Sequence, residues 1–297
     1  MIAQARALPL RVGTIAAGLV LAAFVLGPIV WMINSSFQLD RDLFTSPPHL
    51  IPQQPTLDNY RYIITRRAPP TYSGQITGRR ASGEALSIIP ALRNSFIVSL
   101  SVTLITLLFG TLAAYTYARL RFRGRDLTYG FILTSRLIPA ISVAIPIFVL
   151  INRLGLLDTH AALILVYVAF TLPFVMWFLM KYFAFFPPEI EEAALIDGCS
   201  RFGTLARVVV PMAAPGLAAA AAFAFMGAYS EFLFALFLTR TIAAKTAPVI
   251  LVATAINHDV SFALSFAALV LTIVPPMLFA LIFRSYITRG FVGALGR

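Results

Sequence analysis

Six long stretches without a charged side chain dominate the sequence and limit what it can fold into. They cover residues 12–39, 94–118, 137–152, 159–180, 208–230 and 260–283. Most of them reach the ~20 residues that a helix needs to cross a bilayer. Hydrophobic residues make up 59% of the chain and charged residues only 12%, which excludes a soluble globular fold.

The third stretch continues through residues 127–135 on the other side of Arg136, which gives six spans in all. We therefore predict an all-α membrane protein with six transmembrane helices, at residues 12–33, 91–118, 127–151, 161–183, 212–238 and 262–283. Pro139 and Pro146 in the third span predict a bent or partly unwound helix. Broken helices in transporters line cavities, since their freed backbone groups cannot face lipid.

The formal net charge of +11 is interpreted as a signal for membrane orientation, and we expect no nucleic-acid partner. Six spans put the termini, residues 1–11 and 284–297, on the same side as the loop around Gly198. The two short loops on the opposite side hold only Arg153, Arg240 and Lys245. The long segment between the first two spans also carries arginines, but it approaches the ~60 residues beyond which loop charge has little effect on orientation. The predicted inner side holds Arg6, Arg11, Arg119, Arg121, Arg123, Arg125, Lys181, Arg201, Arg207, Arg284, Arg289 and Arg297. Cytoplasmic loops carry an excess of Lys and Arg, so both termini are predicted to be cytoplasmic.

A polar segment at residues 187–211 interrupts the apolar pattern between the fourth and fifth spans. Proline at the start of a helix and carboxylates in its first turn predict a short helix that begins near Pro188. Gly198 is expected to end this helix in a left-handed conformation, and Ser200 to cap a second helix. Pro211 is expected to stop the second helix.

This helix, turn and helix suit the docking of another protein. Ala193 and Ala194 leave a small-residue face that a bulky group can approach closely. The alternative is a solvated, charged loop, which is what most runs of charge are. The ordered spacing of proline, carboxylates and glycine favours docking.

The same segment resembles a family signature. Glu192-Ala193-Ala194, Gly198 after three more residues, and Val210-Pro211 resemble the EAA loop of membrane permease subunits in bacterial ABC importers. Further motifs resemble the carbohydrate-uptake branch, the second-subunit type of maltose permease: Asn94-Ser95, Ala113-Ala114-Tyr115, Arg121-Phe122-Arg123-Gly124, Ile138-Pro139, Gly155-Leu156, Leu172-Pro173-Phe174 and Glu231-Phe232-Leu233. The resemblance runs from about Thr56 to the C-terminus.

The resemblance implies a permease subunit of an ATP-driven ABC importer for a sugar or related polyol. It implies a heterodimer with a second permease subunit, an ABC ATPase dimer and an extracytoplasmic solute-binding protein. The location is then the bacterial cytoplasmic (inner) membrane, with membrane lipid around a multi-pass chain. The residues that couple to the ATPase would be Glu191, Glu192, Ala193, Ala194, Asp197, Gly198 and Pro211.

The resemblance also implies that the chain is not an enzyme and holds no cofactor, because the partner ATPase binds ATP and Mg. The sequence agrees, since it lacks the G-x-x-x-x-G-K-[ST] phosphate loop. Its three histidines, His49, His160 and His258, lie in separate loops without a cysteine or carboxylate at ligand spacing. We therefore predict no metal site.

Ionisable side chains within a span indicate function by default, and two are present, Glu231 and Arg136. Glu231, with Tyr229, Ser230 and Phe232, is a candidate wall of the solute path, where the carboxylate accepts hydrogen bonds from hydroxyls. The alternative is a structural carboxylate bonded to a neighbouring helix or to the partner permease. Arg136 is favoured as a structural partner of helix ends or lipid headgroups.

A direct pair between these two residues is not expected. At 1.5 Å per residue, Glu231 lies ~28 Å above the cytoplasmic start of its helix and Arg136 ~14 Å above its own.

Residues 34–90 form an external segment whose prolines argue against long regular structure. Within it, residues 66–88 have no counterpart in the family pattern, and we interpret them as an insertion that elaborates the surface.

Two rival functions stay open from the residues alone. A secondary transporter working as a single polypeptide needs internal repeats and coupling carboxylates near the midplane, whereas no duplicated half is apparent. A multipass membrane enzyme needs acids, histidines or a nucleophile gathered at one membrane face. The acidic cluster here lies at residues 187–211, with no histidine beside it.

Overall fold

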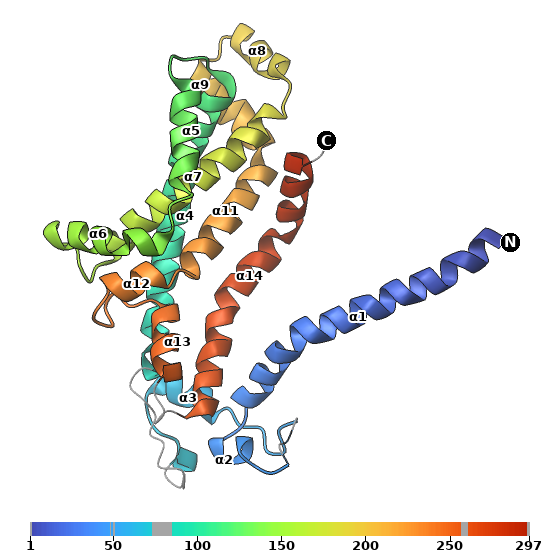
Figure 1. Ribbon diagram of the computed structural model, residues 1–297, viewed down its shortest axis with the longest axis vertical. Coiled ribbons are helices and arrows are strands. Elements are labelled where there is room, and N and C mark those ends of the chain that lie inside the picture. The colour runs from blue at the N-terminus through green and yellow to red at the C-terminus, as the bar shows by residue number, and fades with distance from the viewer. Residues whose placement is uncertain (1, 48, 50, 73–84, 257–260, 296–297) are drawn as a thin grey trace. The chain divides into compact units, whose positions relative to one another are not determined.

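The computed structural model describes residues 2–47, 49, 51–72, 85–256 and 261–295, and every regular element in them is helical. The chain divides into two compact units, Met1–Ile89 with Leu251–Thr272, and Pro90–Ile250 with Ile273–Arg297. Figure 1 labels most of the α-helices, which are α1 (Ile2–Ser36), α2 (Asp40–Leu43), α3 (Asp58–Thr65), α4 (Ile88–Arg119), α5 (Arg125–Ser135), α6 (Ala140–Arg153), α7 (His160–Ala184), α8 (Pro188–Ile196), α9 (Arg201–Thr204), α10 (Val210–Met212), α11 (Ala214–Tyr229), α12 (Leu233–Leu238), α13 (Ala247–Ile256) and α14 (Phe262–Leu295).

Among the described residues, four helices, α1, α4, α7 and α14, are long and apolar enough to cross a membrane. Two bent pairs raise the number of candidate spans to six: α5 with α6, at 95°, and Arg201–Met212 with α11, at 80°. The predicted class, an all-α membrane protein, is confirmed. Part of the predicted insertion at 66–88, residues 73–84, lies outside the described residues.

The bend in the third predicted span lies at the first of its two prolines. Pro139 precedes α6 in an extended conformation, with φ −60° and ψ 130°, whereas Pro146 lies inside the helix. Proline disfavours helical geometry in the residue before it, so the chain leaves α5 at Ser135 and starts again at Ala140.

The segment between the fourth and fifth spans follows the prediction up to its last proline. Gly198 ends the first helix with φ +89°, and the Ser200 hydroxyl accepts a hydrogen bond from the Gly203 amide at 3.1 Å. The second helix ends one residue beyond Pro211, at Met212. Leu205–Val209 forms a π-helical turn, which is wider than an α-helical one, and the chain stays helical to Met212 before it bends.

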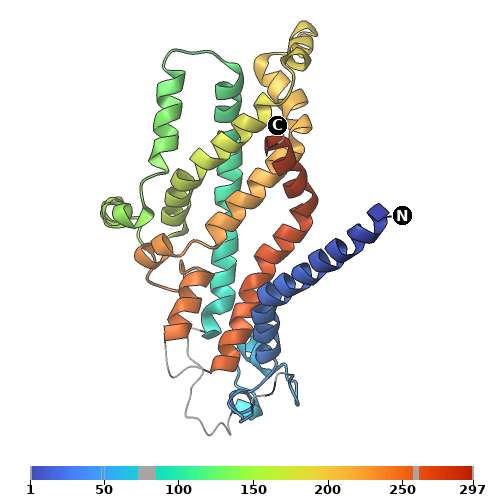
Figure 2. The ribbon, with the colours of Figure 1, turned by 45° about the vertical axis from the view of Figure 1, so that its right-hand side comes forward.

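The core of the second unit consists of two apolar clusters. One lies near α8 and contains Tyr115, Leu179, Phe183 and Leu205. The other contains Val98, Ile151, Leu163, Val166 and Leu238. Helices α7 and α11 pack against each other, as Figure 2 shows.

Close packing of α7 and α11 depends on Gly216. A methyl group at this position would lie 2.6 Å from a ring carbon of Tyr182. We expect Gly216→Ala to lower the free energy of unfolding by about 1–3 kcal/mol, the usual cost of overpacking. Denaturation of the purified protein in detergent measures this. Gly130→Ala is the control, because nothing lies within 4 Å of its new methyl group, and equal stability of the two variants would contradict the packing.

The fifth predicted span is interrupted. Helix α11 ends at Tyr229 and α12 begins at Leu233, so Ser230, Glu231 and Phe232 form a break. A further helix, α13, occupies a region where the sequence predicts none. The backbone amide of Ala247, the first residue of α13, donates to the Ser95 hydroxyl at 2.8 Å. The side-chain amide of Asn94 donates to the carbonyls of Ile242 and Lys245 in the preceding loop, each at 3.0 Å.

The segment after α1 in the first unit is held by a buried asparagine on α3. The Asn59 side chain donates to the carbonyls of Ser36 and Gln38, at 2.7 and 2.8 Å. It also accepts a hydrogen bond from the Tyr72 hydroxyl at 2.5 Å. The end of α1 and the chain around residue 72 are therefore fixed to the same helix.

Asp158 joins the loop after α6 to the loop after α12. Its carboxylate accepts hydrogen bonds from the amides of Arg240 and Thr241, at 2.8 and 2.9 Å, and from the Thr241 hydroxyl at 2.6 Å. Partial burial alone would raise the pKa of this carboxyl group, but these donors outweigh it and hold the pKa below its usual range.

This junction is expected to depend on pH. Because the pKa of Asp158 is lower in the folded protein, its stabilisation is present above the ordinary carboxyl pKa, ~3.9, and is lost as the pH falls through the folded value. We expect Asp158→Asn to reduce the protection of the Arg240 and Thr241 amides about fivefold at pH 7, or ~1 kcal/mol. Hydrogen exchange, corrected for the intrinsic pH dependence, measures this. A difference from wild type that persists unchanged well below pH 3 would contradict it.

Candidate functional site

The short helix α8 presents most of the predicted coupling residues to solvent. Glu192, Ala193, Asp197 and Gly198 are exposed, whereas Glu191 and Ala194 are buried. Pro211 is exposed at the far end of the segment. Successive residues on a helix differ by about 100° in direction, so Glu191 and Glu192 point to different sides although they are neighbours.

Large apolar side chains surround this acidic face. Ile196 is 86% exposed, Phe202 on α9 is 70% exposed, and Phe185 just before α8 is 62% exposed. Apolar groups grouped with charged ones on a projecting element are typical of a protein interface. The arrangement suits a partner that covers the apolar residues and carries positive charge opposite Glu192.

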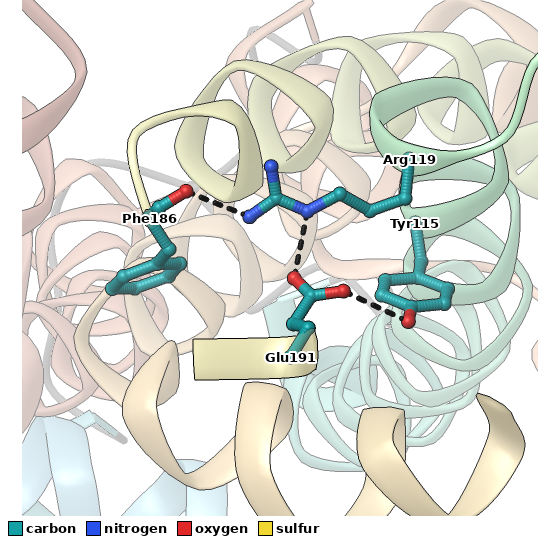
Figure 3. A network of polar contacts seen from close by, with 4 residues as sticks. All are labelled: Tyr115, Arg119, Phe186 and Glu191. Atoms are coloured by element: carbon teal, nitrogen blue, oxygen red, sulfur yellow. Dashed lines mark hydrogen bonds and ion pairs between the residues drawn. The ribbon is translucent and has the colours of Figure 1, made fainter. Parts of the chain in front are cut away.

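Glu191 faces inward and joins α8 to the end of α4 (Figure 3). Its carboxylate accepts hydrogen bonds from the Arg119 guanidinium at 2.7 Å and from the Tyr115 hydroxyl at 3.0 Å. The same guanidinium donates to the Phe186 carbonyl at 2.8 Å. The ion pair is mostly shielded from solvent, since the two side chains are only 13% and 10% exposed. Glu191 therefore orients α8 instead of facing a partner.

Sequence reasoning assigned Arg119 to the positive charge of the cytoplasmic end and missed this bond. The partners are 72 residues apart in the chain. The one available signal is the small-residue patch before Tyr115, which allows close helix packing, but it does not identify Glu191 as the partner.

The break between α11 and α12 orients Glu231. Its carboxylate accepts hydrogen bonds from the amides of Phe234 and Ala235, at 2.9 and 3.2 Å, and so caps the start of α12. It also lines a cavity of about 240 Å³. Tyr229 is buried and stacks on Phe225, with ring centroids 5.8 Å apart.

The other members of the predicted solute path have local contacts. The Ser230 hydroxyl donates to the Met226 carbonyl at 2.8 Å. Phe232 is half-buried against the cluster that contains Phe234. Neither they nor Tyr229 line the cavity beside Glu231.

Arg136 lines the same cavity as Glu231. It donates to the Phe170 carbonyl at 2.6 Å and lies over the Phe174 ring, 5.7 Å from its centroid. The expected separation in depth was wrong, because both helices are broken and do not rise evenly. In the part of the chain that the structure describes, no direct ion pair joins the two residues.

Within the described ranges, no three His, Cys, Asp or Glu side chains gather as the ligands of a metal ion would.

Comparison with known proteins gives one family and several relatives. Residues 87–292, more than half of the chain, match the family described as "Binding-protein-dependent transport system inner membrane component". The trehalose/maltose transport system permease protein MalG of Thermococcus litoralis is 35% identical over 287 residues, 96% of each chain. The diacetylchitobiose uptake system permease protein NgcG of Streptomyces coelicolor is 33% identical over 272 residues, 89% of this chain and 81% of NgcG.

A solved structure has the same fold. It is a crystal structure of a bacterial ABC transporter involved in the import of the acidic polysaccharide alginate. The TM-score is 0.74 at 20% identity, and the match covers 93% of this chain and 96% of the other.

Proposed function

Because the chain belongs to the family of binding-protein-dependent transport system inner membrane components, we propose that α8 couples ATP hydrolysis to the import of a sugar or related polyol. The chain is the permease subunit of an ABC sugar importer, a multi-pass protein of the inner membrane and not the catalytic component. ATP binds to the ATPase of that importer.

The observation that carries the proposal is the orientation of α8. Its outward side offers Glu192, Asp197 and exposed apolar groups to a partner, while its inward side is bonded through Glu191 to Arg119. Because its inward side is bonded to α4, α8 can transmit a force applied to its outward side without tilting away from the other helices. In the proposed mechanism, closure of an ATPase dimer moves α8, and the helices joined to it rock towards an outward-facing cavity.

The second permease subunit forms a heterodimer with this chain, and a solute-binding protein delivers solute at the external face. Both termini are cytoplasmic, on the side of α8, as the distribution of arginines supports. The solute path passes beside Glu231. Ser230 and Phe232 contribute by forming the break that turns Glu231 towards the cavity, and Tyr229 contributes as the last residue of α11 before it.

Affinity purification of the tagged chain tests this function. An ATPase and a second permease subunit should accompany it, whereas a single-chain secondary transporter or a membrane enzyme would be purified without them. Reconstituted with its binding protein, the complex should hydrolyse ATP faster when one of trehalose, maltose or diacetylchitobiose is added. Purification of the chain as a single active transporter would overturn the proposal.

A further inference from the structure

Three polar groups from three separate helical segments converge on the 240 Å³ cavity of the second unit. They are the Arg136 guanidinium from the break before α6, the Tyr167 hydroxyl from α7 and the Glu231 carboxylate from the break before α12. The Tyr167 side chain is only 2% exposed. Its hydroxyl lies beside the Glu231 carboxylate but makes no hydrogen bond of good geometry with any described residue. A buried hydroxyl that is not well bonded costs free energy, and a ligand hydroxyl placed between Tyr167 and Glu231 could bond to both groups.

The three groups retain the capacity for further hydrogen bonds. A carboxylate accepts at about four positions, and Glu231 uses two of them for the amides of α12. A guanidinium has about five N–H donors, and Arg136 uses one of them for the Phe170 carbonyl. The cavity thus offers acceptors, donors and a tyrosine hydroxyl that can do both. Hydroxyl groups, which donate and accept at once, satisfy such a set.

Charge and shape narrow the ligand class. One positive and one negative side chain line the cavity, so it favours a neutral group over an acidic one. Phe170 and Phe234 form an aromatic wall, with ring centroids 5.0 Å apart, against which the C–H face of a sugar ring can lie. The volume is below the ~300–1,000 Å³ of pockets for drug-sized ligands, which fits a single ring.

We propose that this cavity is a solute subsite that binds two adjacent hydroxyls of one neutral sugar ring, through Tyr167, Glu231 and Arg136. Tyr167 lies seven residues after the start of α7 at His160, or ~10 Å along the helix. The subsite is therefore near the end of α7 that is remote from α8. The inference rests on the proposed function and adds to it the residues that recognise the solute.

Gly227 allows the cavity to be filled without disturbing its walls. It lines the cavity, and nothing lies within 4 Å of a Cβ built on it. Gly130 on α5 has equally open surroundings and does not line the cavity. Gly227→Trp and Gly130→Trp thus add the same bulk inside and outside the proposed subsite.

The test uses the purified complex of this chain, the second permease and the ATPase in nanodiscs, without the binding protein. The probe is methyl α-D-glucopyranoside at millimolar concentration, and the readout is saturation-transfer NMR on its ring protons. We expect clear transfer in wild type and in Gly130→Trp, and at least a fivefold loss in Gly227→Trp. Tyr167→Phe should reduce the transfer at least threefold with little change in thermal stability, because it removes one poorly bonded hydroxyl and leaves the ring in place.

Three results would overturn the subsite: no transfer in wild type, equal transfer in wild type and Gly227→Trp, or glucuronate bound more than tenfold tighter than the glucoside. The last result would indicate an anion site. Failure of the proposed function is distinguishable, since it appears earlier, as a chain that is purified without an ATPase and a second permease.

Discussion

Gly198→Pro and Glu192→Lys are each expected to reduce solute accumulation at least tenfold while ATP hydrolysis and membrane insertion continue. Proline fixes φ near −65°, whereas Gly198 has φ +89°, so the turn after α8 cannot form. Glu192 lies on the exposed side of α8, and lysine there reverses the charge offered to the ATPase. Uptake and ATP turnover in proteoliposomes, at equal membrane abundance, measure the two effects.

The matched controls are Gly198→Asn and Glu189→Lys. Asparagine tolerates the left-handed conformation better than other residues with a side chain, so Gly198→Asn should retain most of the uptake. Glu189 is exposed in the first turn of α8 but lies outside the predicted coupling set. Wild-type accumulation by both Gly198→Pro and Glu192→Lys would refute the coupling role of this helix.

Removing one partner of the Arg119–Glu191 pair is expected to destabilise the protein strongly. Arg119→Met or Glu191→Met leaves a largely buried charge without its counterpart, which typically costs about 3–5 kcal/mol. The double variant should be more stable than either single variant, because both charges are gone. Unfolding of the purified protein in mixed micelles gives the four stabilities of this double-mutant cycle.

Two further variants distinguish loss of the ion pair from loss of a single hydrogen bond and from loss of an exposed positive charge. Tyr115→Phe removes one hydrogen bond to the carboxylate and should cost about 1–3 kcal/mol. Arg123→Met removes an exposed arginine from the loop after α4 and should change stability by no more than about 0.5 kcal/mol. Additive losses in the double variant would show that Arg119 and Glu191 contribute independently.

The sequence predicts much of this architecture, because the bilayer requires long apolar helices and because single residues such as proline, glycine and serine mark helix ends. The helix limits at Pro188 and Gly198 and the cap at Ser200 follow from backbone preferences of single residues. Each of these signals acts within a few residues, so it can be read without knowledge of the tertiary fold.

The missed features depend on contacts between distant segments or on the hydrogen bonding of a whole turn. The inward direction of Glu191 follows from its bond to Arg119 on another helix. Helix α13 is fixed by Asn94 and Ser95, about 150 residues earlier in the chain. Pro211 is accommodated by the π-helical turn before it, and no preference of proline alone predicts such a turn.

The bond between Glu191 and Arg119 also determines how many helices are connected to α8 and can move with it. The chain joins α8 covalently to α7 on one side and, through the bend at Ala213, to α11 on the other, while Arg119 adds α4. In the proposed mechanism, a force on α8 therefore acts on all three helices at once. If the Glu191–Arg119 bond were weakened, part of each movement of α8 would twist α8 locally instead of moving α4. Fewer solute molecules would then be transported per ATP hydrolysed, while the affinities for solute and for ATP would stay the same.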